Sequence, residues 1–163
     1  MDPRLVPGDA APDFVLYDKD SNRVQLSGYR GQKLILFFYP SAETPGCTIE
    51  ACDFRDNEHI FTALGYKVIG ISSDNTLKVK HWAEKRNLQY TLLLDPDKVV
   101  HRSFGINRWS SPVSMITGGR SRSTFVIDQD GKIDVALYNV QAFGHGRHGQ
   151  RRIQKRDRWL VLR

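Results

Sequence analysis

A short apolar run that stops abruptly at a proline is the feature that most limits how this chain can fold. Residues 33–39 read Lys-Leu-Ile-Leu-Phe-Phe-Tyr, and Pro40 follows directly. A continuous apolar run of this length is typical of a strand that is buried on both faces of a sheet. The run therefore predicts a central strand with protein layers on either side of it.

Strand and helix patterns alternate along the rest of the chain. Short apolar runs between turn residues predict further strands at 14–17, 23–26, 66–71, 92–94, 123–127 and 133–140. Apolar residues at helical spacing predict helices at 47–64, at about 73–86 and at 99–104. The first two strands form an N-terminal β-hairpin and the last two a second hairpin. The predicted fold class is α/β, with a central mixed β-sheet flanked by helices.

Length and charge indicate one domain with an unusual tail. The 163 residues suffice for a single full core, and we place the domain at residues 1–145. The net charge of +6 lies entirely within residues 144–163, because the rest of the chain is balanced. The sequence pI near 9.5 thus describes a basic C-terminal tail, residues 146–163, and a nucleic-acid-binding domain is not predicted.

The beginning of the chain carries no export signal that we can identify. It lacks the apolar segment of a signal peptide, and no stretch approaches the roughly 20 apolar residues of a membrane span. We therefore expect no membrane association and a reducing, cytoplasmic location. In such a compartment, a cysteine pair is more often catalytic, redox-active or metal-binding than a structural disulfide.

The chain has two cysteines, Cys47 and Cys52, and both follow the apolar strand after one loop. The order Pro45-Gly46-Cys47 places the first sulfur at the opening turn of the predicted helix. Free backbone N–H groups and the helix dipole favour an anion there, and the thiolate is the reactive form of cysteine. Cys47 is thus a candidate nucleophile. The alternative is that it is an ordinary buried small side chain.

The spacing of the cysteines limits how they can pair. Five residues on a helix correspond to a rise of about 7.5 Å and a rotation of about 140°. A disulfide needs Cα atoms within roughly 7 Å and side chains that face each other. Cys47 and Cys52 can therefore bridge only if the first turns of the helix unwind. Alternatively, Cys52 is a core residue beside Phe54. A zinc site is disfavoured because no second pair of ligands follows, and we predict neither metal nor cofactor.

The pattern Pro40-x-x-x-Thr44-x-x-Cys47 resembles the active-site signature of peroxiredoxins. The longer stretch from Phe38 to Asp56 is similar to the peroxiredoxin Q group, also called bacterioferritin-comigratory proteins. Further matching segments lie at 7–14, 70–74, 93–97, 122–128 and 138–140. Together these segments extend the resemblance over most of residues 7–105 and 122–145.

This resemblance implies a thioredoxin-like fold and a thiol-dependent peroxidase that reduces hydrogen peroxide and organic hydroperoxides. Cys47 would be the peroxidatic residue and become a sulfenic acid. Cys52 would be the resolving residue and condense with it to an intramolecular disulfide. The resemblance further implies recycling by thioredoxin or a similar dithiol donor, and a monomeric protein.

The resemblance also implies roles for the residues around the sulfur. The Thr44 hydroxyl and the backbone N–H groups near Gly46 and Cys47 would hold the peroxide oxygens. Pro40 would shield the sulfur from bulk water. Arg122 would stabilise the thiolate and the charge that develops during reaction.

Two further details concern the arginine. Arg120 also lies near the expected position, but the residues that flank Arg122 match the family better. Glu50 is expected to orient Arg122.

Two segments depart from the family pattern. Residues 106–121 lack the usual Lys- and Tyr-bearing sequence, and the basic tail replaces an amphipathic C-terminal helix. We favour a diverged terminus for the tail. The alternative is a redox-regulated binding module, whose basic arm docks nucleic acid or an anionic surface. A dithiol electron carrier is disfavoured because the chain lacks Cys-x-x-Cys. The run Gly144-x-Gly-x-x-Gly149 is not a dinucleotide site, because too few residues follow it.

Overall fold

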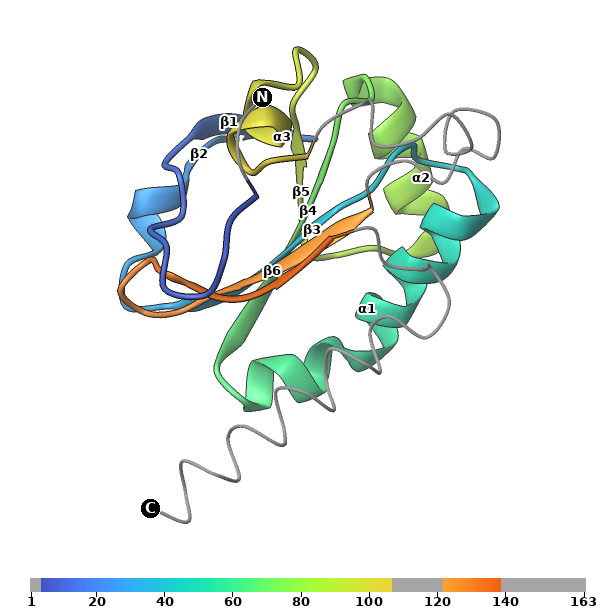
Figure 1. Cartoon of the computed structure of the whole chain (residues 1–163). Helices are drawn as coiled ribbons and strands as arrows, with labels where there is room; N and C mark the ends of the chain where they lie inside the picture. Colours follow the sequence, from blue (N-terminus) through green and yellow to red (C-terminus); the bar gives the residue numbers. More distant parts are fainter. Residues whose placement is uncertain (1–3, 107–121, 139–163) are drawn as a thin grey trace.

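A single mixed sheet forms the centre of the computed structural model, which describes residues 4–106 and 122–138 (Figure 1). In this part of the chain the sheet has seven strands in the order β2-β1-β5-β4-β3-β6-β7. Neighbours β3/β4 and β4/β5 are parallel, and the other pairs are antiparallel. The predicted mixed sheet and N-terminal hairpin are therefore both present.

The elements follow the predicted order along the chain. The strands are β1 (Val15–Asp18), β2 (Arg23–Gln25), β3 (Lys33–Phe38), β4 (Tyr66–Ser72), β5 (Thr91–Leu94), β6 (Ser123–Ile127) and β7 (Ile133–Leu137). The helices are η1 (Leu26–Tyr29), α1 (Pro45–Ala63), α2 (Thr76–Arg86) and α3 (Val99–Ser103). The basic tail, residues 146–163, and nearly all of segment 106–121 lie outside the described residues.

Several boundaries differ from the sequence prediction. Helix α1 begins at Pro45, two residues earlier than predicted, because proline suits a first turn whose N–H groups have no helical partner. Helix α2 begins at Thr76 rather than at 73, where the Asn75 side chain caps it by accepting a hydrogen bond from Lys78 N at 2.9 Å. Leu26 leaves the predicted second strand and opens the short 3-10 helix η1, which the sequence analysis did not predict.

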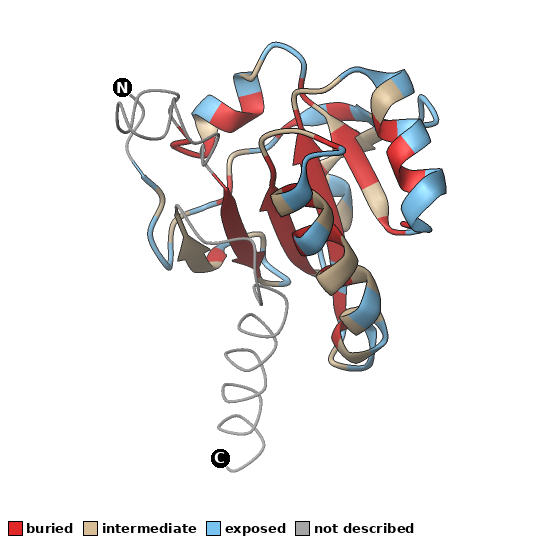
Figure 2. Cartoon of the chain, turned by 90° about the vertical axis from the view of Figure 1, so that its right-hand side faces the viewer, coloured by how far each residue is buried: buried red, intermediate tan, exposed pale blue. Residues whose placement is uncertain are grey.

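The two faces of β3 explain its continuous apolar run. Ile35, Phe37 and Tyr39 pack with α1 and α2 on one side, in a cluster that includes Phe54 and Trp82. Leu34, Leu36 and Phe38 of β3 pack on the other side with the N-terminal segment and α3. Their cluster includes Phe14 and Phe104. Figure 2 shows the buried strands at the centre and the exposed outer surfaces of the helices. Within the described ranges, no helix is long and apolar enough to cross a membrane.

Strand β4 needs a glycine where its neighbours approach most closely. Gly70 is paired in register with Phe37 of β3 and with Leu92 of β5. A Cβ at this position would lie 2.8 Å from both Leu92 Cδ2 and Phe37 Cζ. Both neighbours are completely buried, so neither side chain can move away freely. Only a residue without a side chain allows these three strands to pack.

We therefore expect Gly70→Ala to lower the free energy of unfolding by about 1–3 kcal/mol, the usual cost of overpacking a core. Urea unfolding followed by circular dichroism would measure it. Gly28→Ala is the matched control, because nothing lies within 4 Å of a Cβ at Gly28. It should change the free energy by less than about 0.5 kcal/mol. Equal stabilities for the two variants would contradict the proposed close packing.

Candidate active site

Cys47 lies where the chain returns from the central strand into α1. The chain leaves β3 at Phe38, crosses a short loop and enters the helix at Pro45, so Cys47 is the third helical residue. Its side chain is only 1% exposed. Cys52 is half-buried on the same uninterrupted helix, and both cysteines are free thiols. This arrangement agrees with the spacing argument that an intact helix keeps the two sulfurs apart.

Arg122 reaches Cys47 through the pairing of two strands. It directly precedes β6, and Ser123 of β6 is paired with Phe38 at the end of β3. The guanidinium therefore lies at the end of the sheet where α1 begins. Arg122 Nη2 donates to Cys47 Sγ at 3.4 Å, in a buried hydrogen bond. A guanidinium at this distance stabilises negative charge on the sulfur.

Glu50 is the second group on Arg122. Its Oε1 atom lies 3.4 Å from Arg122 Nη1, and its side chain is completely buried. Burial raises the pKa of Glu50 to about 8, although the Arg122 charge acts in the opposite direction. At neutral pH the carboxyl group is therefore mostly protonated. The positive charge of Arg122 then has no competing carboxylate and is available to the sulfur.

Several buried polar atoms of this pair, and one of the residue that follows Arg122, make no hydrogen bond within the described ranges. They include both carboxyl oxygens of Glu50, Arg122 Nη1 and Ser123 Oγ. Glu50 Oε1 and Arg122 Nη1 form the ion pair with each other, so Glu50 Oε2 and Ser123 Oγ are the two of these atoms left without any partner in this part of the chain. Leaving a buried polar atom unpaired costs roughly 1–3 kcal/mol, so native proteins retain such atoms where they have a use. The buried polar atoms at this point therefore have hydrogen-bonding capacity that the described residues do not use.

The preceding loop supplies the remaining predicted residues. Thr44 precedes the first helical residue, and its hydroxyl donates to Ser41 O at 2.8 Å rather than capping the helix. The N–H groups of Gly46 and Cys47 belong to the first turn, where no helical carbonyl can accept them. Pro40 is half-buried and directly follows the buried Tyr39. The structure thus brings Arg122 and Glu50 to Cys47, with Thr44, Gly46 and Pro40 in the segment that leads into it.

Three contacts that the sequence analysis missed join α1 to α2 and to the residue that precedes β5. Trp82 Nε1 donates to Thr48 Oγ1 at 3.0 Å, Tyr90 Oη to Ala51 O at 2.8 Å, and Arg55 Nη1 to Arg86 O at 2.5 Å. We call these contacts the tethers. A buried Trp or Tyr usually needs a hydrogen-bond partner for its polar atom. Trp82 and Tyr90 therefore indicated that such contacts exist, but the sequence does not show which residues accept them. The tethers hold one side of α1 around Cys52.

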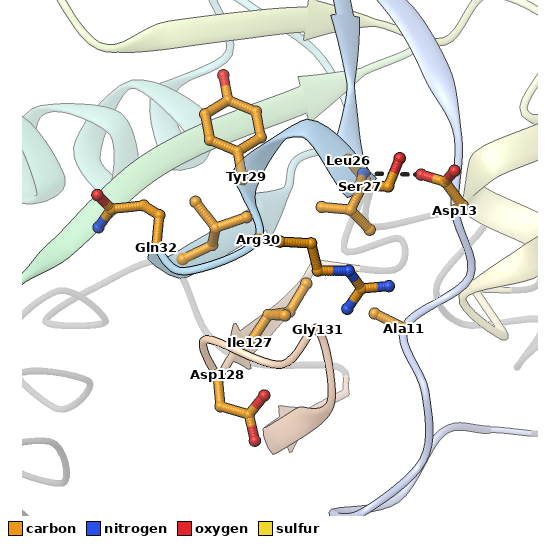
Figure 3. Close-up of a pocket in the computed structure, with 11 residues that line it drawn as sticks. Ala11, Asp13, Leu26, Ser27, Tyr29, Arg30, Gln32, Ile127, Asp128 and Gly131 are labelled. Atoms are coloured by element: carbon orange, nitrogen blue, oxygen red, sulfur yellow. Dashed lines mark hydrogen bonds between the residues drawn. The ribbon is translucent and has the colours of Figure 1, made fainter.

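The pocket in Figure 3 is separate from this site. It is lined by Leu34 and Ile127, which are paired at the beginning of β3, and by Asp13 and Arg30. Cys47 follows the opposite end of β3. Within residues 4–106 and 122–138, no three His, Cys, Asp or Glu side chains are close enough to hold a metal ion.

Comparisons with known proteins agree with this geometry. The model of the AhpC/TSA family matches residues 7–136. A putative peroxiredoxin of Mycobacterium tuberculosis (strain ATCC 25618 / H37Rv) is 49% identical over 142 residues, which are 87% of this chain and 90% of that protein. Peroxiredoxin Bcp of Escherichia coli (strain K12) is 41% identical over 141 residues, 86% of this chain and 90% of that protein.

Solved structures agree as well. The crystal structure of peroxidoxin BcpB from Mycobacterium tuberculosis superimposes with a TM-score of 0.80 and 34% identity. The match covers 93% of this chain and 98% of that chain.

These matches identify the class of protein that the fold and the thiol site define. The chain belongs to the AhpC/TSA family, within its peroxiredoxin Q or Bcp group. It has the predicted thioredoxin-like fold and is a thiol-dependent peroxidase. The alternative of a redox-regulated binding module gains no support from these comparisons.

The raised pKa of Glu50 predicts a pH dependence of stability. Between about pH 5 and pH 8, folded Glu50 retains a proton that the unfolded chain releases, so the free energy of unfolding should fall as pH rises. Glu50→Gln should remove this fall, because its amide does not titrate. Urea unfolding of both proteins across this range would measure the difference.

Glu84→Gln, at an exposed position on α2, is the matched control and should keep the parent slope. A Glu50→Gln variant whose stability falls as steeply as that of the parent would contradict the protonated state.

Proposed function

We propose that Cys47 is the peroxidatic residue and Cys52 the resolving residue of this peroxidase. The observation that carries the proposal is the buried hydrogen bond from Arg122 Nη2 to Cys47 Sγ, at 3.4 Å. Cys47 is also the cysteine at the first turn of α1, where the backbone N–H groups have no helical partner and can donate to a peroxide. Cys52 lies deeper in the same helix and has no comparable position.

In the first step, the Cys47 thiolate attacks the terminal oxygen of the peroxide. An S–O bond forms to the terminal oxygen and the O–O bond breaks, so the sulfur is oxidised to a sulfenic acid. The other oxygen leaves as hydroxide or alkoxide and takes up a proton to give water or an alcohol. Arg122 would stabilise the charge that moves onto the leaving oxygen. The N–H groups of Gly46 and Cys47 and the Thr44 hydroxyl would orient the peroxide, and Pro40 would limit access of water.

Glu50 would determine whether the positive charge of Arg122 stabilises the Cys47 thiolate alone or a second anion as well. While Glu50 carries its proton, Arg122 faces one anion, the thiolate. When the pH exceeds about 8, the ionised carboxylate competes for the same guanidinium, because both lie within 3.4 Å of its nitrogens. Glu50 thus acts on the sulfur through Arg122 and does not itself react.

In the second step, the Cys52 thiolate attacks the sulfenic sulfur of Cys47. The S–S bond forms, the S–O bond breaks, and the departing hydroxide takes up a proton to give water. This step requires the first turns of α1 to unwind, which breaks the tethers at Thr48 and Ala51. The tether at Arg55 lies beyond Cys52, so the rest of the helix can stay docked on α2.

A dithiol donor then returns the disulfide to two thiols by thiol–disulfide exchange. We propose thioredoxin or a similar dithiol protein as this donor, and hydrogen peroxide and organic hydroperoxides as substrates. We further propose a cytoplasmic monomer in which residues 1–145 form the catalytic domain and 146–163 a separate tail. The family match over residues 7–136 supports this domain assignment.

The two cysteines make the mechanism testable by stoichiometry. One equivalent of hydrogen peroxide should convert both thiols of the reduced protein into a disulfide, as read by mass spectrometry. Cys52→Ser should stop at a sulfenic acid that dimedone traps, because no second thiol can displace the oxygen. Cys47→Ser should keep a free Cys52 thiol over the same time. Rapid oxidation of the Cys47→Ser variant would show that Cys47 is not the residue that attacks the peroxide.

Arg122 gives an independent prediction. Arg122→Met should slow sulfenic acid formation by about 10²–10³-fold, the usual loss when one donor to developing negative charge is removed. Stopped-flow measurement with hydrogen peroxide in a Cys52→Ser background would isolate this step. Arg102→Met is the matched control, because exposed Arg102 lies on α3, on the opposite side of the sheet from α1. Equal rates for the two variants would remove Arg122 from the mechanism.

A further inference from the structure

The loop that leads into α1 is held from outside by two charged residues. Asp74 follows the end of β4, and Lys78 lies in the first turns of α2. Asp74 Oδ2 accepts a hydrogen bond from Ala42 N at 2.6 Å, and Lys78 Nζ donates to Ser41 Oγ at 2.8 Å. Lys78 Nζ also lies 3.3 Å from Asp74 Oδ1. We call Asp74, Lys78 and their two loop partners the clamp.

The clamp residues are themselves firmly placed. The Asp74 side chain is 12% exposed, and Asp74 N donates to the buried Ser72 Oγ at 3.3 Å. Lys78 N donates to the capping side chain of Asn75. Because the Asp74 carboxylate is largely buried, solvent screens this pair less than a fully exposed one, although the Lys78 side chain is 35% exposed. Both partners can impose a position on the loop.

The clamp determines the position of the residues next to Cys47. Ala42 is completely buried and belongs to the same apolar cluster as Cys47. Glu43 follows it with φ of 68°, a left-handed conformation that is unfavourable for a residue with a side chain. Thr44 then returns to Ser41 through its hydroxyl, which donates to Ser41 O at 2.8 Å. The clamp therefore holds the strained turn from which Thr44 and α1 start.

We propose that Asp74 and Lys78 are positioning residues for the reaction of Cys47 with peroxide. Through Ser41 and Ala42 they set the turn that places Thr44 and the first helical N–H groups around the sulfur. The inference rests on the proposed role of Cys47 as the attacking thiol. Neither residue has to touch the peroxide, because Asp74 acts through the Ala42 backbone and Lys78 through the Ser41 side chain.

The position of the clamp separates the two chemical steps. The clamp holds Ser41 and Ala42, which precede Cys47 in the chain, whereas disulfide formation unwinds the helical turns that carry Cys47 toward Cys52. Loss of the clamp should therefore slow peroxide attack, which needs an ordered first turn, and leave disulfide formation nearly unchanged. A purely structural role would not produce this selectivity, because general destabilisation does not single out the step that depends on order.

The test compares Asp74→Asn, Lys78→Met and Lys78→Arg, each with intact Cys52 and in the Cys52→Ser background. Rapid quenching and mass spectrometry give the rate of sulfenic acid formation in the Cys52→Ser series. In the series with intact Cys52, the decay of the sulfenic acid into the disulfide, at peroxide concentrations high enough that attack does not limit it, gives the rate of disulfide formation. Asp74→Asn and Lys78→Met should slow sulfenic acid formation by about 10–100-fold, as expected when reacting groups are misplaced by a fraction of an ångström to an ångström. Lys78→Arg should recover most of the rate, because a guanidinium can make both contacts.

Lys80→Met is the matched control. Lys80 is exposed on the same helix, and its amine lies 3.9 Å from Asp20, away from the loop. Its rates should stay within about twofold of the parent. The proposal is overturned if sulfenic acid forms at the parent rate in both Asp74→Asn and Lys78→Met, or if both steps slow equally.

If Asp74→Asn fails to fold, the rates of sulfenic acid formation in Lys78→Met and Lys78→Arg are sufficient to test the proposal. A parent protein that forms no sulfenic acid at Cys47 would instead refute the proposed function on which the inference rests.

Discussion

The contact between Arg122 and Cys47 depends on the register of β6 against β3, and the rest of the site depends on that contact. The two residues are 75 positions apart in the chain, and the pairing of Phe38 with Ser123 brings them together. A slip of one residue in this pairing would turn the neighbouring side chains to the other face of the sheet. Because β3 is apolar on both faces, its hydrophobic pattern alone does not prevent such a slip, and the close fit of its buried side chains in the two clusters has to oppose it.

Burial gives this site its electrostatic character. One guanidinium faces a sulfur and a carboxyl group, and the site cannot easily hold two anions against a single cation. Desolvation resolves the competition by raising the pKa of Glu50 to about 8, so that the carboxyl group keeps its proton at neutral pH. The same low exposure strengthens the attraction between Arg122 and the sulfur. The helix that carries both cysteines is docked by the tethers, and the clamp holds the loop that leads into it, so its first turns lie between two fixed points.

Sequence reasoning predicted the elements and the two-thiol helix more fully than the contacts that support them. The apolar run predicted the central strand, and the spacing of Cys47 and Cys52 predicted two free thiols on one helix. The start of α1 was placed two residues late, because the prediction began the helix at the cysteine rather than at the proline before it. The tethers and the clamp were missed because each joins residues more than 30 positions apart. Local patterns carry no information about such partners.

By itself, the sequence determined the fold class, the position of Cys47 at a helix start and the impossibility of a disulfide within an intact helix. Each of these follows from local periodicity and covalent geometry, which operate over a few residues. Only the tertiary structure decided that Arg122 donates to the sulfur, that Glu50 is desolvated beside it, and that Asp74 and Lys78 hold the approach loop. Those properties depend on strand register and burial, and they exist only once distant segments have packed together.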